Sequence, residues 1–253
     1  MGIDLTGRVV VVTGGNRGIG LGIARAVAEA GADVAIWGRD ADRNAEAAER
    51  LAATGRRIHA ATCDVTDEDR VAAAMDATIE ALGPLDAFVA NAGVGGALLP
   101  YADVTLEEWR RVMTVDLDGV FLSTREAVRR LIEHRRPGAL VLVSSTSAIH
   151  GAARNVAYGT AKTGLLGLTR ALAVELARHH IRVNALLPGW TITELAEAAY
   201  ADDRFRAVTT RRTPVRRWAE PADMGPAAVF LCDPTIEYHT GDHLVVDGGY
   251  TVF

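Results

Sequence analysis

Tyr158 and Lys162 are the two residues whose types and spacing suggest chemistry most directly. They lie four residues apart in the stretch AYGTAKTGLLGLTRALAVE (157–175), so on a helix their side chains would share one face. Lys162 is also the only lysine in a chain with 27 lysine and arginine residues. An ammonium is a compact charge that can approach a phenol more closely than a planar guanidinium can, and it favours the phenolate form. The pair therefore predicts a tyrosine that acts as a general acid or base.

Ser145 stands thirteen residues before Tyr158, at the end of the predicted strand ALVLVSS (139–145). From there its hydroxyl could donate a hydrogen bond to a carbonyl or alcohol oxygen. Each of the three residues also has an ordinary alternative: Tyr158 as a helix residue with a solvated hydroxyl, Ser145 as a strand terminator, and Lys162 as part of a solvated face. A glycine-rich turn earlier in the chain favours the chemical interpretation.

That turn, TGGNRGIG (13–20), directly follows the predicted strand RVVVVTG (8–14) and opens a helix. Glycines let the backbone approach a pyrophosphate, whose charge is met by the N–H groups and dipole of the helix N-terminus. The spacing differs from G-x-G-x-x-G, so a turn that only packs a helix against a strand remains an alternative. The residues predicted to contact a dinucleotide here are Gly14, Asn16, Arg17, Gly18, Ile19 and Gly20.

The end of the second predicted strand, WGRD (37–40), bears on the choice between NADP and NAD. Dinucleotide sites use an acidic residue here to hold a ribose 2′-hydroxyl, or an arginine to accommodate a 2′-phosphate. Gly38 stands at the acidic position, Arg39 follows it, and Arg17 lies in the glycine turn. We therefore expect NADP(H) to be preferred, with NAD(H) as the alternative cofactor. Arg39 could instead be an ordinary exposed residue, and Asp40 either a ribose ligand or the N-cap of the next helix.

The third predicted strand closes with CDV (63–65). Asp64 and Val65 could lie beside the adenine of a dinucleotide. They could equally form a strand-to-helix turn in which the aspartate is a polar terminator.

The elements that would position these residues alternate between apolar strands and helix-period segments. Strands without in/out alternation are covered on both faces, and strand-helix-strand repeats give right-handed crossovers. The pattern predicts an α/β fold, a doubly wound, Rossmann-like parallel sheet of about seven strands with helices on both faces, as one domain over residues 1–253. Long helices are expected from about Thr105 and about Asn155, and residues 190–217 are expected to form a substrate lid. The strands are predicted at 8–14, 33–37, 57–63, 86–91, 139–145, 181–188 and 243–247.

Composition narrows the classes of partner. The chain has 253 residues, 49% of them hydrophobic, and a formal net charge of -5. This charge argues against binding to nucleic acid, and no apolar run approaches the ~20 residues of a membrane span, so a small-molecule substrate is expected. Cys63 and Cys232 lie far apart, which fits a reducing, cytoplasmic compartment better than a disulfide framework. The seven histidines lack the spacing of a metal site, and no metal is expected.

In their order and spacing, these motifs resemble those of the short-chain dehydrogenase/reductase family of NAD(P)-dependent oxidoreductases, the single-domain type. The resemblance covers essentially the whole chain, and it implies an enzyme and a homotetramer. The motifs that carry it are TGGNRGIG (13–20), NAG (91–93), Ser145, YGTAK (158–162), PGWTIT (188–193) and GDHLVVDGG (241–249).

The resemblance also implies roles for individual residues. Tyr158 would protonate the substrate oxygen during reduction, Ser145 would orient that oxygen, and Lys162 would bond the nicotinamide ribose while favouring the phenolate. The backbone would pass the cofactor at Asn91, Ala92 and Gly93. The carboxamide end would be held by Pro188, Gly189, Thr191 and Thr193.

Two positions depart from the family pattern. The long fourth helix reads VDLDG where the family usually has VNLxG, so Asp116 replaces an asparagine that helps to hold a water in a proton relay from the lysine. Asp116 is therefore placed among the catalytic residues, with its charge as the open question. Thr191 stands where the family often has Ile or Val, but the family uses the backbone there.

The substrate is less readable from the sequence than the chemistry. His150 and Trp190 are predicted to border the substrate, and the basic run Arg211–Arg217 is either a solvated face or a contact for an anionic substrate. The expected function is NADP(H)-dependent interconversion of a ketone and a secondary alcohol, with a 3-oxoacyl thioester or a similar small ketone as the leading substrate. The alternatives are an NAD-dependent sugar or alcohol dehydrogenase and a non-catalytic dinucleotide-binding regulatory or scaffold protein.

Overall fold

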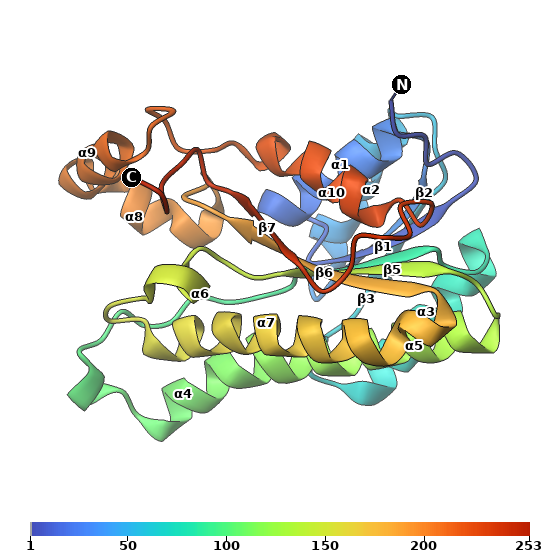
Figure 1. The fold of residues 1–253 in the computed structure, drawn as a ribbon, viewed down its shortest axis with the longest axis horizontal. Helices are drawn as coiled ribbons and strands as arrows, with labels where there is room; N and C mark the ends of the chain where they lie inside the picture. The colour runs from blue at the N-terminus through green and yellow to red at the C-terminus, as the bar shows by residue number, and fades with distance from the viewer. Residues whose placement is uncertain (1) are drawn as a thin grey trace.

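The structure, a computed structural model, describes residues 2–253 and is built on one seven-stranded parallel sheet (Figure 1). The strand order β3-β2-β1-β4-β5-β6-β7 means that the chain starts near the middle of the sheet and winds outward in both directions. The predicted doubly wound fold is thus confirmed. The strands are β1 (Val9–Thr13), β2 (Asp33–Gly38), β3 (Ile58–Thr62), β4 (Ala87–Ala90), β5 (Gly138–Val143), β6 (Ile181–Pro188) and β7 (His243–Val246).

The burial of the strands follows their place in the sheet. Every residue of β1, β5 and β6 is buried, as expected of strands covered by helices on both faces. The edge strands β3 and β7 are mostly only partly buried. Because all the strands are parallel, the carboxyl ends of β1, β4, β5 and β6 meet at one edge, where open α/β sheets bind their ligands.

Two layers of helices cover the sheet (Figure 1). One face carries α1 (Gly18–Glu29), α2 (Ala41–Ala52) and α10 (Gly225–Cys232). The other carries α3 (Glu68–Leu82), α5 (Gly119–Glu133) and α7 (Val156–Leu176). Between sheet and helices, the Trp37 ring meets Phe88 edge-on at 5.5 Å, and its indole N–H donates to Thr78 of α3 at 3.0 Å. Such an aromatic pair contributes about 0.5–1.5 kcal/mol beyond its area burial, and the hydrogen bond satisfies the buried donor.

The helix expected from about Thr105 changes its pitch part-way along. The Thr105 hydroxyl caps it by accepting the Glu108 N–H at 3.1 Å. The helix α4 (Leu106–Met113) leads into a π-helical turn, η2 (Thr114–Asp118), and then into α5. A π turn inside an α-helix is uncommon and is frequent at functional sites, and this one carries the fully buried Asp116.

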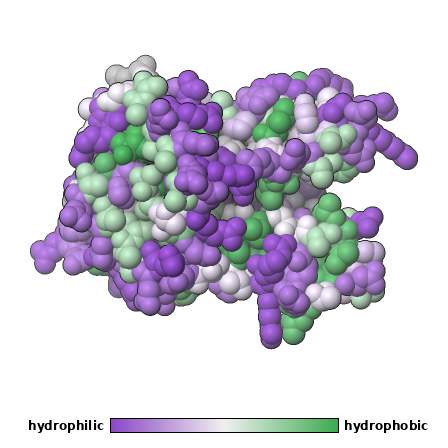
Figure 2. Space-filling view, turned by 180° about the vertical axis from the view of Figure 1, so that it is seen from behind, coloured by the Kyte–Doolittle hydropathy of each residue, from purple (hydrophilic) through white to green (hydrophobic). Residues whose placement is uncertain are grey.

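Residues 190–217 contain η4 (Glu194–Ala196), α8 (Glu197–Ala201) and α9 (Asp203–Arg212). Aromatic rings pack together at the base of this segment. The centre of the Trp190 ring lies 5.0 Å from the centre of the Phe205 ring and 4.9 Å from that of Trp218. In Figure 2 the molecule is hollowed between the part that carries α8 and α9 and the part that carries α4. The short elements η1 (Tyr101–Asp103), α6 (Ser147–His150), η3 (Ala177–His179) and η5 (Pro221–Met224) complete the chain.

Within residues 2–253, no helix combines the length and apolar character needed to cross a membrane.

Candidate active site

The ends of β1 and β4 are joined through the buried Thr13. Its hydroxyl oxygen accepts the N–H groups of Asn91 and Ala92, both at 3.0 Å, and Asn91 Nδ2 donates to the Thr13 carbonyl at 2.9 Å. The NAG segment is therefore fixed against the glycine turn by both backbone and side chain. Sequence analysis missed Thr13, although a polar residue that ends an apolar strand was a usable signal.

The turn between β1 and α1 has the shape of a phosphate cradle. Gly18 has a φ of +50°, and a Cβ on Gly20 would lie 2.2 Å from the Gly14 carbonyl oxygen, so neither position accepts a larger residue without strain. Arg17 is the N-cap of α1 but makes no side-chain cap bond, which leaves the first N–H groups of the helix for another acceptor. These groups fit the pyrophosphate of a dinucleotide.

The end of β2 is shaped by two asparagines. A Cβ on Gly38 would lie 2.4 Å from both Asn16 Nδ2 and Asn44 Oδ1, and Asn16 donates to Asn44 at 2.7 Å. Asn44 also donates to the carbonyls of Gly38 at 2.9 Å and Ala61 at 3.0 Å. Gly38 is thus needed for packing, and the buried Asn44 is a structural residue of this corner that sequence analysis did not find.

Asp64 and Arg39 lie close enough to interact at the same edge. The Asp64 carboxylate accepts the N–H of Thr66 at 3.0 Å and its hydroxyl at 2.7 Å. Although burial would raise it, these hydrogen bonds and the charge of Arg39 hold the pKa of Asp64 below its usual value. Arg39 itself is exposed, and Val65 is buried beside Gly119.

Arg17 reaches across to the 190–217 segment. Its Nη1 lies 2.5 Å from Glu194 Oε2, and Nη1 of Arg43, on α2, lies 2.9 Å from the same oxygen. Sequence analysis named Arg17 but neither Arg43 nor Glu194. Glu194 is 177 residues from Arg17, so no local spacing could have linked them.

The segment after β6 crosses the glycine turn. The Thr191 hydroxyl donates to the Gly189 carbonyl at 3.0 Å and stabilises the bend after Pro188. A Cβ on Gly18 would lie 3.2 Å from Thr193 Cγ2, so Thr193 packs directly on the turn. These residues are brought to the edge of the sheet where the predicted cofactor site lies.

Lys162 and Asp116 form a buried ion pair at the reacting end. Lys162 Nζ lies 3.3 Å from Asp116 Oδ2, and the two side chains are 5% and 0% exposed. The other carboxylate oxygen accepts the Val94 N–H at 2.7 Å, and Nζ donates to the Val143 carbonyl at 3.2 Å. The π turn thereby fixes Asp116 between α7 and the loop that follows NAG.

The electrostatics of this pair keep Lys162 charged. Burial alone would lower the pKa of Lys162, but the negative charge of Asp116, together with Tyr158, raises it above the usual value. Lys162 Nζ lies 5.5 Å from the centre of the Tyr158 ring, which is partly exposed. A buried ammonium therefore lies beside the ring of a partly exposed tyrosine.

Ser145 follows β5 at the same edge. Its Oγ accepts the Ser147 N–H at 3.1 Å, so its own proton can be donated elsewhere. The neighbouring Ser144 donates to the Lys162 carbonyl at 2.7 Å and joins the end of β5 to α7. Ser145 follows β5, whereas Tyr158 and Lys162 lie on α7. The hydrogen bond from Ser144 to the Lys162 carbonyl joins these two elements.

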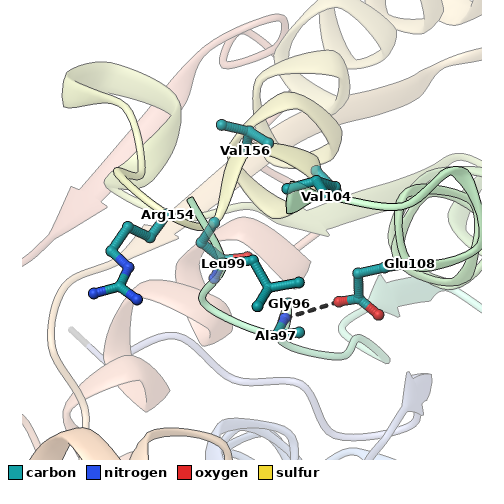
Figure 3. Close-up of a pocket in the computed structure, with 9 residues that line it drawn as sticks. Gly96, Ala97, Leu99, Val104, Glu108, Arg154 and Val156 are labelled. Carbon is teal, nitrogen blue, oxygen red and sulfur yellow. Dashed lines mark hydrogen bonds between the residues drawn. The ribbon is translucent and has the colours of Figure 1, made fainter. Parts of the chain in front are cut away.

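A cavity lies between the loop at 94–100 and the start of α7 (Figure 3). Glu108 of α4 holds this loop by accepting the Ala97 N–H at 2.8 Å. Arg154, with a φ of +63°, donates from Nε to the Leu98 carbonyl at 3.1 Å. In the part of the chain that the structure describes, its guanidinium has no acidic partner within ion-pair distance.

The two other residues predicted to border the substrate, His150 and Trp190, lie on different elements, α6 and the start of the 190–217 segment. The His150 ring is exposed and lies 5.5 Å from the Tyr250 ring near the C-terminus. Trp190 belongs to the aromatic base of the 190–217 segment. In the basic run, Arg217 pairs with Asp223 at 2.6 Å and Arg212 lies 4.3 Å above the Tyr250 ring, so both have partners within the chain.

The chain is similar to known proteins over nearly its whole length. A family model described as enoyl-(acyl carrier protein) reductase matches residues 14–251. The cis-4-hydroxycyclohexanecarboxylate dehydrogenase of Sinomonas cyclohexanicum is 41% identical over 251 residues, covering 99% of each chain. The 5-keto-D-gluconate 5-reductase of Escherichia coli strain K12 is 34% identical, covering 98% of this chain and 97% of that one.

A solved structure is similar over nearly its whole length. It is a gluconate 5-dehydrogenase from Burkholderia cenocepacia in complex with NADP and tartrate, with a TM-score of 0.94 and 33% identity, covering 99% of this chain and 98% of that one. This chain belongs to the short-chain dehydrogenase/reductase family. The resemblance seen in the motifs is confirmed.

Membership settles the class of reaction. This short-chain dehydrogenase/reductase is an NAD(P)-dependent oxidoreductase that interconverts a ketone and a secondary alcohol by hydride transfer. The geometry offers groups that such chemistry needs: a backbone cradle for a pyrophosphate, an ammonium 5.5 Å from the centre of a phenol ring, and a serine hydroxyl at the end of β5. Within residues 2–253, no group of three His, Cys, Asp or Glu side chains is placed to hold a metal ion.

Proposed function

We propose that this protein reduces a ketone, or oxidises the corresponding secondary alcohol, with NADP(H) as its preferred cofactor. The observation that carries the proposal is the buried Lys162–Asp116 pair beside Tyr158. In reduction, Tyr158 donates its proton to the carbonyl oxygen while the Ser145 hydroxyl donates a hydrogen bond to the same oxygen. Bound nicotinamide supplies the hydride.

Lys162 has two tasks in this proposal. Its ammonium stabilises the negative charge that remains on Tyr158 after proton transfer, because the two groups meet in a largely buried site. Its remaining N–H groups donate to the hydroxyls of the nicotinamide ribose. The backbone at Asn91–Gly93 and the bend at Pro188–Thr193 line the rest of the cofactor site.

Arg39 and Arg17 support the preference for NADP(H). Arg39 is exposed just after the end of β2, where a 2′-phosphate is recognised in this fold. Because the residue before it is Gly38, no carboxylate stands at that position to repel the phosphate. A gluconate 5-dehydrogenase of similar structure was solved with NADP. Arg43 adds a third guanidinium that sequence analysis did not find.

The cofactor preference is tested by comparing the affinities for NADPH and NADH. The protein is expected to bind NADPH more tightly, and Arg39→Ala is expected to reduce this preference by about 1–3 kcal/mol, the contribution of a charge-assisted hydrogen bond. Arg50→Ala, an exposed change at the far end of α2, is the control. Tighter binding of NADH by the parent protein would contradict the preference.

For the substrate, we propose a ring or sugar-derived ketone that carries a carboxylate. Two relatives act on such acids, a hydroxycyclohexanecarboxylate and a ketogluconate. Arg154 supports this class. It lies just before α7, donates to the Leu98 carbonyl in the loop at 94–100, and has no acidic partner within residues 2–253. A 3-oxoacyl thioester remains the second candidate, because a 3-oxoacyl-[acyl-carrier-protein] reductase is 34% identical.

A panel of ketones assayed for NADPH oxidation tests this choice. It compares 4-oxocyclohexanecarboxylate, its neutral methyl ester, 5-ketogluconate and a 3-oxoacyl thioester. The carboxylates are expected to have the highest kcat/KM, and Arg154→Ala is expected to raise their KM while leaving the KM of the ester unchanged. Turnover of the thioester alone would favour the second candidate, and turnover of none with either cofactor would contradict both proposed substrate classes.

Three further features belong to this proposal. Residues 190–217 act as the substrate lid, the subunits assemble as a homotetramer, and the protein works in the cytoplasm. Exposed apolar side chains on α5 and α7, namely Phe121, Ile132 and Val174, support assembly. Burial raises the pKa of the two free thiols, Cys63 and Cys232, to about 12, which suits residues that take no part in redox chemistry. Light scattering at micromolar concentration tests the tetramer.

A further inference from the structure

The lid and the nucleotide end of the site are joined by a single carboxylate. Glu194 begins η4 at the base of the lid, and its Oε2 lies 2.5 Å from Nη1 of Arg17 and 2.9 Å from Nη1 of Arg43. The preceding residue, Thr193, packs on Gly18 of the glycine turn. Three segments that are far apart in sequence therefore meet at this carboxylate.

These guanidiniums lie at the corner where, in dinucleotide-binding folds of this kind, the 2′ position of the adenosine ribose is recognised. Arg17 lies in the glycine turn, and Arg43 lies in the first turn of α2, just after the end of β2. Within residues 2–253, Arg17 has no acidic partner other than Glu194, while Arg43 also lies 3.4 Å from Asp40. Both arginines thus already hold an anion in this structure.

We infer that Glu194 determines cofactor specificity by competing with the adenosine 2′-phosphate for Arg17 and Arg43. This inference rests on the proposed function for its account of which cofactor is used. A phosphate carries more charge than a carboxylate and has three acceptor oxygens, so it can displace Glu194 from the two guanidiniums. A ribose 2′-hydroxyl has no charge and leaves the ion pairs in place.

The exchange has a consequence for the lid. All three side chains are about half exposed, at 53% for Glu194, 51% for Arg17 and 47% for Arg43. Exposed ion pairs are weak and can be exchanged at little cost, which suits a contact that has to open. NADP(H) therefore loosens the base of the lid from the glycine turn, whereas NAD(H) leaves it attached.

The first test measures the binding of NADPH and NADH to the parent protein and to Glu194→Gln. Removing the competing charge is expected to tighten NADPH binding about threefold to tenfold and to change NADH binding less than about twofold, the range of one or two half-exposed ion pairs. The NADPH effect should shrink at high salt, because exposed charges are screened. Glu197→Gln, an exposed change one turn further along with no ion pair of its own in the described residues, is the control.

The second test uses hydrogen exchange of the backbone at residues 194–201. With saturating adenosine 2′,5′-bisphosphate, this segment is expected to exchange faster than with 5′-AMP in the parent protein, and equally with both ligands in Glu194→Gln. Equal NADPH affinities for the parent and Glu194→Gln would overturn the inference even if ketones are reduced. A parent protein that prefers NADH would instead contradict the proposed cofactor, and a selective gain of NADPH affinity in Glu194→Gln would still support the role of Glu194.

Discussion

Two groups of ion pairs lie at the two ends of the proposed cofactor site, and they differ chiefly in burial. At the reacting end, Lys162 and Asp116 are 5% and 0% exposed and are held by π-helical and α-helical backbone. At the nucleotide end, Glu194 and its two arginines are about half exposed and join three separate segments. Loss of one partner of a buried pair leaves an uncompensated charge, whereas an exposed charge is solvated by water.

This difference suits the two tasks. The proposed proton transfer needs a fixed ammonium near Tyr158. Burial holds the ammonium there and strengthens its interaction with a charge on the phenol, because the surroundings screen it less than water does. Recognition of a phosphate that enters and leaves needs cations that can change partners. The buried pair therefore holds the Lys162 ammonium in one place, and the exposed group lets its two arginines change from one anion to another.

The largest effect is expected from Tyr158→Phe, which removes the proposed acid and little else. Turnover should fall at least about a hundredfold, as is typical of a positioned general acid, while NADPH binding stays nearly intact. Steady-state kinetics and a cofactor titration measure the two properties. Tyr238→Phe, the same change at a fully exposed tyrosine, should be neutral. Near-normal turnover of Tyr158→Phe would refute the assignment.

A smaller but still large effect is expected from Lys162→Arg, which tests whether charge alone is enough. The planar guanidinium cannot occupy the space that the ammonium shares with Asp116 and the Val143 carbonyl, and a misplacement near the chemistry can cost about a hundredfold in rate. The larger side chain should also lower the free energy of unfolding by about 1–3 kcal/mol.

Denaturant unfolding separates these two effects of Lys162→Arg. Lys162→Met, which keeps the stem and removes the charge, serves as the comparison. A fully active and equally stable Lys162→Arg protein would show that the buried site is not specific for lysine.

The same contrast explains how much the sequence alone could predict. The sequence pattern predicted all seven strands. It was clearest for β1, β5 and β6, because a strand buried on both faces has to be apolar along its whole length. Tyr158 and Lys162 could be paired because both lie on α7, where spacing determines a shared face. The glycine turn was readable because its position between β1 and α1 is local.

Contacts between distant segments could not be predicted in this way. The Glu194 ion pairs and the hydrogen bond between Asn16 and Asn44 each depend on the final packing of separate elements. The approach of Asp116 to Lys162 was implied only by the family resemblance, and the structure confirms it. No local spacing marked the π turn either, because residues 105–133 read as one continuous helical pattern. Only the departure from the family motif marked Asp116 as a residue to examine.

Asp116→Asn is expected to have the smallest effect on turnover near neutral pH, and it tests the electrostatics of the buried pair most finely. The Asp116 charge raises the pKa of Lys162, and in Asp116→Asn burial should lower that pKa, so that the ammonium loses its proton at a lower pH. The same negative charge opposes a second one on Tyr158, and alcohol oxidation needs the phenolate as its base. Both limbs of the pH–rate profile for oxidation should therefore lie at higher pH in the parent protein than in Asp116→Asn.

The expected displacement is about one pH unit or less, equivalent to at most about 1.4 kcal/mol. Reduction near neutral pH should change little, because it uses the protonated phenol. Asp118→Asn, an exposed change in the same π turn, should leave the profile in place. Superimposable oxidation profiles for the parent protein and Asp116→Asn would show that Asp116 acts only through its hydrogen bond to Val94. If the oxidation profile of Asp116→Asn lay at higher pH than that of the parent protein, the carboxylate would help Tyr158 to ionise. The buried pair would then have the opposite electrostatic role.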